Sequence, residues 1–384
     1  MVTDEEDTMG KKSCGAALAL ALIAPSVAGA EASRTPFGAL ADGRPVEAIT
    51  LSNGKGVTAR ILSYGAILQS LVAPDRAGHK ADIVLGYADL AGYLAKPNYF
   101  GATVGRYANR IAAGHFTLDG KTYALATNDG PNALHGGKAG FDKKLWTVIE
   151  VKDAPRPSVT LGYTSPDGEE GYPGTLTVTA TYTLDETDAL TLDYRATTSK
   201  PTVVNITNHS YFNLAGEGSG RSILTNLLTI PAEAITPVDK TLIPTGELRA
   251  VAGTPFDFRT PTEIGKRIRD GREEQIRFGQ GYDFNYVLTR AATTTPHLAA
   301  RVEDPWSGRV LEIATNQPGL QFYSGNLLDG TAVGKSGTSY RQSDGMAMEP
   351  QVFPDTPNQP ALGSARLDPG QTYHSQIIYR LSTR

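Results

Sequence analysis

Apolar and polar residues alternate over long stretches of the chain, as they do in β-strands that are buried on one face only. Between 175 and 184 every second residue is apolar, and five threonines occupy the positions between them. The alternation stops at 185–189 and resumes from Leu190 to Ala196. Because successive side chains of a strand point to opposite faces, the two stretches predict a hairpin with one buried and one solvated face.

The rest of the chain carries many strand and turn signals and few helix signals. Asp119-Gly120, between two short alternating runs, is typical of a two-residue hairpin turn. Short helical patterns occur near 89–96 and 264–268. Since we find no long linker and no repeat, we predict that 31–384 forms a single all-β domain, a large antiparallel β-sandwich.

The N-terminus has the features of an export signal. A pair of lysines precedes an apolar run from Cys14 to Ala24, and small residues that suit cleavage end at Ala30. The run is too short to span a bilayer. The residues before Met9 are acidic, which suits a signal poorly, so Met9 is a second candidate for the start. We predict a signal peptide over 1–30 and a mature protein that is periplasmic or secreted; the alternative is an ordinary helix-forming tail.

Composition excludes several classes of partner and chemistry. The 384 residues carry a formal net charge of −4 and no basic patch, which argues against a nucleic-acid partner. Hydrophobic residues make up 40% of the chain, enough for a large core. The one cysteine, Cys14, lies in the predicted signal peptide, so the mature chain is expected to have no disulfide and no thiol nucleophile.

The segment 203–216 concentrates polar side chains around a histidine. Val204 and Ile206 begin a strand-like alternation. Five hydrogen-bonding side chains follow within six positions: Asn208, His209, Ser210, Tyr211 and Asn213. Burying such groups without partners costs on the order of a few kcal/mol each, so we expect a polar ligand at the end of this strand. A histidine can exchange a proton with that ligand near neutral pH.

Two further segments place donors where a ligand could use them. Asn109 and Arg110 lie in a glycine-bounded stretch, and the guanidinium offers a rigid set of donors that suits several oxygens at once. His135 precedes a glycine pair, which lets the backbone approach a ligand closely. The alternatives are a surface arginine on a turn and a structural histidine.

Two carboxylates stand in segments that suit sugar chemistry. Asp283 lies among the aromatic residues of 281–286, and rings pack on sugar C–H surface while a carboxylate accepts hydroxyl protons. Glu349 lies between Met348 and Pro350, so we expect a partly dry carboxyl with a raised pKa that acts as a base near pH 7. The alternatives are a strand-end aspartate that caps backbone and a solvated glutamate.

Other catalytic machinery is not indicated by the sequence. The six histidines show neither the His-x-His nor the His-Glu-x-x-His spacing of metal ligands, so we expect no metal site. The chain also has no Gly-x-Ser-x-Gly nucleophile elbow and no phosphate-binding loop.

Six motifs together resemble the aldose 1-epimerase family, the galactose mutarotases. They are Gly-Arg-Tyr-Ala-Asn-Arg-Ile (105–111), Asn-Ala-Leu-His-Gly-Gly (132–137), Asn-Ile-Thr-Asn-His-Ser-Tyr-Phe-Asn-Leu-Ala-Gly (205–216), Gly-Tyr-Asp-Phe-Asn-Tyr (281–286), Gln-Phe-Tyr-Ser-Gly-Asn (321–326) and Glu-Pro-Gln-Val-Phe-Pro-Asp (349–355). Each motif alone is a weak match. All six in the family's order, across nearly the whole mature chain, are specific.

The resemblance implies a β-supersandwich with a sugar site in an open cleft, and neither a cofactor nor a metal. It implies that His209 is the general acid and Glu349 the general base. Five residues resemble those that hold sugar hydroxyls in the family: Asn109, Arg110, His135, Asp283 and Gln321. Two positions depart from the pattern: Pro350 stands where threonine is common, and the residue at 321 varies, which leaves the preferred sugar open.

The expected activity is interconversion of the α and β anomers of free aldoses, such as glucose, galactose or pentoses, by acid/base ring opening. The expected partner is a monosaccharide, and the protein a monomer or homodimer. One alternative is a non-catalytic carbohydrate-binding module, which needs no acid/base pair. A second is a glycoside hydrolase, which would hold Asp283 and Glu349 less than ~10 Å apart with His209 remote. A third, a relative acting on sugar phosphates, would need further basic residues.

Overall fold

Antiparallel β-structure dominates the computed structural model, which describes residues 1–5, 29–95 and 98–384. The largest sheet has nine strands in the order β11-β12-β13-β14-β30-β24-β23-β18-β21. Their bounds are β11 Thr147–Lys152, β12 Ser158–Ser165, β13 Leu176–Leu184, β14 Ala189–Thr198, β30 Tyr373–Thr383, β24 Arg309–Thr315, β23 His297–Glu303, β18 Leu227–Thr229 and β21 Thr262–Glu263.

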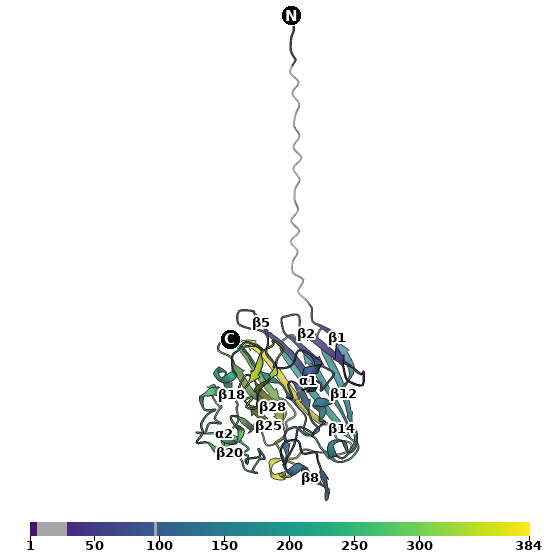
Figure 1. Cartoon of the computed structure of the whole chain (residues 1–384), viewed down its shortest axis with the longest axis vertical. Coiled ribbons are helices and arrows are strands. Elements are labelled where there is room, and N and C mark those ends of the chain that lie inside the picture. The colour runs from purple at the N-terminus through teal and green to yellow at the C-terminus, as the bar shows by residue number, and fades with distance from the viewer. Residues whose placement is uncertain (6–28, 96–97) are drawn as a thin grey trace.

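Two further sheets complete the main layers. The six-stranded sheet has the order β17 Tyr211–Phe212, β28 Met346–Gln351, β25 Gly319–Tyr323, β22 Asp283–Val287, β19 Ala234–Ile235 and β20 Arg249–Ala250. The five-stranded sheet runs through β1 Glu31–Ala39, β2 Pro45–Ser52, β3 Thr58–Leu62, β4 Leu68–Pro74 and β5 Lys80–Asp82. In Figure 1, β25 and β28 lie between α2 and β20 on the left and β1, β12 and β14 on the right.

Short elements connect these sheets. The two-stranded pairs are β7 Arg110–Ile111 with β10 Ala133–Leu134, β8 His115–Leu118 with β9 Lys121–Ala124, β15 Thr202–Val203 with β29 Arg366–Leu367, β16 Thr207–His209 with β6 Ala102–Val104, and β26 Asp329–Val333 with β27 Ser339–Arg341. The described α-helices are α1 Leu90–Ala95 and α2 Glu274–Gly279. The 3-10 turns are Ala112–Gly114, Phe141–Lys143, Glu169–Gly171, Ile223–Thr225, Ile264–Lys266 and Pro360–Leu362.

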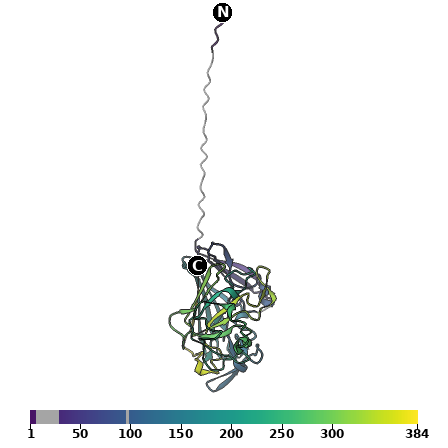
Figure 2. The same cartoon turned by 90° about the vertical axis from the view of Figure 1, so that its left-hand side faces the viewer.

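One large hydrophobic core joins the sheets. The inward residues of the predicted hairpin, among them Val178 and Tyr182 on β13 and Leu192 on β14, are fully buried in it. Phe322 and Met348 reach the same core from the six-stranded sheet. Seen from the side, the folded body is narrower than in Figure 1 (Figure 2), as expected for packed sheets. The predicted all-β architecture is therefore confirmed, and so is the hairpin.

Of the predictions for short elements, one turn and one helix are confirmed and a second helix is wrong. Asp119 and Gly120 both have positive φ angles, as a type I′ turn requires, and they join β8 to β9. The helix predicted near 89–96 is α1. The helix predicted near 264–268 is wrong: the chain forms only a three-residue 3-10 turn there. Ile264 and Ile268 are both buried, so the apolar residues at this spacing mark two core positions and not one face of an α-helix.

The segment 203–216 is not the single strand end that we predicted. It divides among β15, β16 and β17, and each of these strands pairs in a different sheet. The cause is a change of backbone partner along the segment. For example, the N–H of Ile206 donates to the hydroxyl of Tyr373, while the next residues pair with β6. His209 lies in this crossing, as the last residue of β16.

Most of the predicted signal peptide, including the apolar run 14–24, lies outside the described residues. The first strand, β1, begins at Glu31, directly after the predicted cleavage point. Among the described residues, we find no helix whose length and apolar character would let it cross a membrane.

Candidate active site

The structure places all seven predicted site residues around one cavity of about 180 Å³. This volume is well above what a single water needs, and it suits a ligand of monosaccharide size. The lining residues are Asn98, Tyr99, Asn109, Arg110, Leu134, His135, His209, Tyr211, Asp283, Gln321, Tyr323, Leu327, Leu328 and Glu349.

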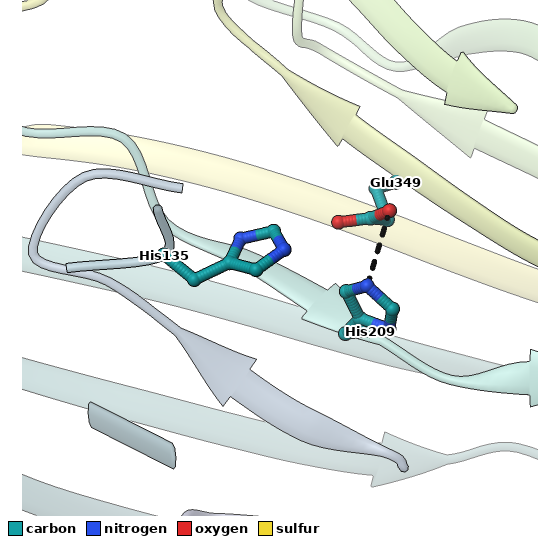
Figure 3. Close-up of side chains that lie close together, drawn as sticks. All are labelled: His135, His209 and Glu349. Atoms are coloured by element: carbon teal, nitrogen blue, oxygen red, sulfur yellow. Dashed lines mark ion pairs between the residues drawn. The ribbon is translucent and has the colours of Figure 1, made fainter. Parts of the chain in front are cut away.

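His209 and Glu349 meet in this cavity from different sheets. His209 is the last residue of β16, and Glu349 lies in β28, where it pairs with Gln321 of β25. The Nε2 atom of His209 lies 3.5 Å from Oε1 of Glu349, and both side chains are almost fully buried. Figure 3 shows the ring of His209 facing the carboxyl, with His135 beside both. The contact brings together two groups that can exchange a proton.

Burial acts on these two groups in opposite directions. It raises the pKa of Glu349 well above its usual range, and the nearby charge of Asp283 adds to the effect while Arg110 opposes it. Burial lowers the pKa of His209 to about 4. Each shift disfavours the charged form in a dry site. Burial thus favours the neutral form of each group, and the raised pKa of Glu349 agrees with the partly dry setting that we expected from Met348 and Pro350.

Most of the polar groups near His209 serve the fold, which corrects our interpretation of that segment. Asn208 donates to the carbonyl of Gly101, and its Oδ1 accepts from the N–H and the hydroxyl of Ser210. Asn213 donates to two backbone carbonyls and accepts from the N–H of Ala215. A chain that changes sheets twice leaves backbone groups unpaired, and these amides satisfy them. Of the five polar residues, His209 and Tyr211 line the cavity.

His135 and Asn109 are linked through their backbones, and this fixes the tautomer of the histidine. The N–H of His135 donates to the carbonyl of Asn109, and the N–H of Asn109 donates to Nδ1 of His135 at 3.1 Å. Because Nδ1 must accept there, the proton of the neutral ring resides on Nε2. Burial first, then the neighbouring His209, hold the pKa of His135 well below its usual range. His135 is thus a neutral donor.

Two histidines and a carboxylate are a possible set of metal ligands. The nearest ligand atoms of His135, His209 and Glu349 all lie within 4.8 Å of one another. A metal at Nε2 of His135 would require its proton to move to Nδ1. There it would face the N–H of Asn109, donor against donor. The donor set therefore fits proton transfer and hydrogen bonding better than it fits metal ligation.

Arg110 and Asp283 add a polar wall to the cavity. Nε of Arg110 donates to Asp129 at 2.7 Å, and its NH1 lies 3.8 Å from Asp283. Gln321 donates from Nε2 to Asp283 at 2.6 Å. Burial raises the pKa of Asp283, while the charge of Arg110 opposes the rise. The arrangement offers both donors and acceptors to a polyhydroxylated ligand.

Aromatic and apolar side chains form the remaining walls. The ring of Tyr99 lies 4.8 Å from that of His135 and 5.6 Å from that of His209, measured between centroids. Tyr323 is buried, whereas Leu327 is exposed at the rim. Tyr99 and Leu327 were not predicted from the sequence, although Asn98-Tyr99-Phe100 has the same mixture of polar and aromatic residues as 281–286.

A third missed residue, Glu170, holds the loop that carries His135. Its carboxylate accepts from the N–H groups of Lys138 and Ala139 at 2.9 and 3.1 Å. A Cβ atom on Gly137 would lie 2.3 Å from Oε2 of Glu170, so the approach requires glycine. No local signal reveals this contact, because Glu170 is more than thirty residues from the loop in sequence.

Comparisons with known proteins agree with this geometry. A family model described as Aldose 1-epimerase matches residues 47–380. The galactose mutarotase of Bos taurus is 49% identical over 322 residues, which cover 84% of this chain and 90% of the relative. The aldose 1-epimerase of Escherichia coli (strain K12) is 38% identical over 343 residues, covering 88% of this chain and 96% of the relative.

Solved structures give the same result for the fold. The galactose 1-epimerase from Lactobacillus acidophilus NCFM has a TM-score of 0.81 at 29% identity, covering 92% of this chain and 99% of the other. The aldose epimerase homologue from C. elegans has a TM-score of 0.79 at 33% identity, covering 88% and 98%. The resemblance found in the six motifs is confirmed, and the chain belongs to the aldose 1-epimerase family of isomerases.

Proposed function

We propose that the protein interconverts the α and β anomers of free aldoses, with His209 and Glu349 as the acid/base pair. The observation that supports this most strongly is their 3.5 Å contact inside a cavity lined by sugar-compatible donors and acceptors. The matched relatives named galactose mutarotase and aldose 1-epimerase support the same reaction. Each well-placed acid or base contributes about 10²–10⁴-fold to the rate.

The reaction needs one proton removed and one supplied. Glu349 takes the proton from the C1 hydroxyl while His209 protonates the ring oxygen, and the ring opens to an aldehyde. Rotation about C1–C2 and closure on the other face complete the exchange, with the roles of the pair reversed. Both oxygens are attached to C1, so an acid and a base in contact with each other can reach both.

The pair holds the single proton that this cycle requires. Burial favours the neutral forms, protonated Glu349 and neutral His209, and transfer of the proton from Glu349 to His209 would produce carboxylate and imidazolium without any change in net charge. Oε2 of Glu349 has no hydrogen-bond partner among the described residues, so it is free to accept from a sugar hydroxyl. His135, with its proton on Nε2, and Arg110 stabilise the negative charge that develops on oxygen during opening.

The alternative functions fit the site less well. A retaining or inverting glycoside hydrolase relies on two carboxyls, and we expected His209 to be remote in that case, yet it touches Glu349. A binding module gains nothing from a buried acid/base pair, whose desolvation is costly. For a sugar phosphate, Arg110 is the one arginine or lysine among the described lining residues, and Asp129 and Asp283 already lie against it.

The substrates that we propose are neutral aldoses, with galactose and glucose as the first to test. NMR saturation transfer between the α and β signals of each sugar separates the candidate functions. The proposal expects faster exchange in the presence of protein, and no release of free sugar from aryl glycosides. Glycoside cleavage, or binding without faster exchange, would contradict it.

We also propose that the protein is exported as a single-domain enzyme that begins near Glu31. The support is the sequence alone: lysines, a short apolar run and small residues up to Ala30. Expression of the full chain in a bacterium with a periplasm, followed by fractionation and intact-mass measurement, tests this. A periplasmic product that starts at Glu31 is expected. A full-length cytoplasmic product would contradict export.

A further inference from the structure

Gln351 is a buried amide that the proposed reaction does not use. It lies two residues after Glu349 on β28, so the two side chains project from the same face of the strand. Gln351 is fully buried and is absent from the residues that line the cavity. Its amide lies directly behind the lining residues and forms hydrogen bonds with them.

Its amide joins three residues from separate parts of the site. Nε2 of Gln351 donates to Oε1 of Gln321 and to Oδ1 of Asn285, both at 3.2 Å. Its Oε1 accepts from Nδ2 of Asn109 at 3.4 Å. Two of these partners, Gln321 and Asn109, line the cavity. The amide therefore connects β22 and β25 with the loop that leads into β7.

A glycine makes this connection possible. Gly319 is the residue that pairs with Gln351 across β25 and β28. A Cβ atom on Gly319 would lie 2.3 Å from Oδ1 of Asn285, so any larger residue would displace the Asn285 amide from Gln351. The space for the amide group is thus built into the strand pairing.

The hydrogen bonds run in one direction, which determines how Gln321 is oriented. Gln351 presents an N–H to Gln321, whose own Nε2 then faces the carboxylate of Asp283 at 2.6 Å. If the Gln321 amide were reversed, its oxygen would face the Asp283 carboxylate and its N–H would face the Gln351 donor. Both contacts would be repulsive, so Gln351 and Asp283 together select one orientation.

We propose that Gln351 is a positioning residue for sugar recognition, because it orients chiefly the amide of Gln321, and through a longer hydrogen bond that of Asn109, and so sets the pattern of donors and acceptors on the cavity wall. The inference rests on the proposed function of this site. Gln351 has no contact with His209 or Glu349 in the chain of hydrogen bonds described. Its removal should therefore affect sugar binding more than the chemical step.

The test uses Gln351→Met, which keeps the length of the side chain and removes its hydrogen bonds, and Gln351→Asn, a milder variant that keeps an amide but shortens its reach. Steady-state polarimetry with galactose and glucose gives KM and kcat. We expect KM to rise about tenfold, equivalent to 1.4 kcal/mol, with kcat within about threefold of wild type. If Gln351→Met does not fold, Gln351→Asn alone decides the outcome.

Two comparisons separate positioning from a general structural role. In a Gln321→Ala background, adding Gln351→Met should raise KM by less than about twofold, because Gln351 acts in large part through Gln321. Gln317→Met is the matched control, since Gln317 is a buried amide that bonds to the carbonyl of His374 away from the cavity. It should lower the melting temperature and leave KM unchanged.

Three results would overturn the inference. They are an unchanged KM in both Gln351 variants, a full tenfold effect retained in the Gln321→Ala background, and an equal rise of KM in Gln317→Met. If the wild-type protein is active and any one of these results is obtained, this inference alone is overturned. A wild-type protein without mutarotase activity overturns the proposed function and the inference together.

Discussion

The Nδ1 atom of His135 accepts a hydrogen bond from the backbone N–H of Asn109. This contact makes Nε2 of a neutral histidine the donor that faces the cavity. A neutral donor aimed at an oxygen that gains negative charge stabilises the transition state more than the ground state. We therefore propose for His135 a role distinct from that of Arg110, namely that of a neutral hydrogen-bond donor to the reacting oxygen.

We predict that His135→Phe, which keeps a planar ring and removes the donor, lowers kcat about 100-fold with a smaller effect on KM. Steady-state polarimetry with galactose measures both constants. His79→Phe is the control, since His79 is exposed and lies outside the cavity. A kcat of His135→Phe within threefold of wild type would show that the donor is not used in the transition state.

The buried carboxyl of Glu349 should cost stability at alkaline pH. Its pKa is raised in the folded protein, so the folded state keeps a proton that the unfolded state releases as pH rises. Glu349→Gln has no ionisable group at this position, so its stability does not fall with pH for this reason. We predict that its melting temperature matches wild type near pH 4.5, exceeds it by an amount that grows as pH rises, and then levels off above the folded-state pKa. Thermal unfolding between pH 4.5 and 9 measures this; a constant difference would refute it.

Asp129 should support sugar binding through Arg110. Its carboxylate accepts from Nε of Arg110 at 2.7 Å, while NH1 of Arg110 lies 3.8 Å from Asp283. We predict that Asp129→Asn raises KM about three- to tenfold and leaves kcat nearly unchanged, a modest effect because Asp129 is partly exposed. Asp153→Asn, at a residue that bonds to the N–H of Ala32 outside the cavity, is the control. A fall in kcat without a change in KM would contradict this role.

Glu170 should matter for the position of His135. A glutamine at 170 can accept with its oxygen only, so one of the N–H groups of Lys138 and Ala139 would lose its partner. We predict that Glu170→Gln lowers kcat about three- to tenfold and also lowers the melting temperature. Glu186→Gln, at an exposed position, should change neither. An unchanged kcat in Glu170→Gln would mean that the loop is held without this carboxylate.

The fold class and seven of the residues that line the cavity could be predicted from the sequence, because strand alternation and the motifs that resemble the aldose 1-epimerase family are both local patterns. Strand alternation reveals a buried face, and motifs with unusual polar density mark positions such as Asp283. Contacts between residues that are far apart in the sequence could not be predicted from it. Gln351 and Glu170 look unremarkable until their partners at 321 and 138–139 are brought beside them.

The segment around His209 shows how a correct prediction can rest on an incomplete reason. We attributed its polar residues to a ligand, yet Asn208 and Asn213 satisfy backbone groups where the chain changes sheets. A polar side chain near a sheet crossing and one near a ligand look alike in sequence, since both satisfy a buried hydrogen-bonding group. The pairing of His209 with Glu349 was available from the family resemblance, and the structure supplies its distance.

We propose that His209 and Glu349 perform the proton transfers. Polarimetry of freshly dissolved α-galactose tests it directly, with wild type compared with Glu349→Gln and His209→Asn. Both variants keep a polar group of similar size, and equilibrium dialysis with galactose checks that the cavity still binds sugar. We predict that each variant loses at least about 100-fold in kcat while binding remains measurable. Rates equal to wild type in either variant would contradict the account.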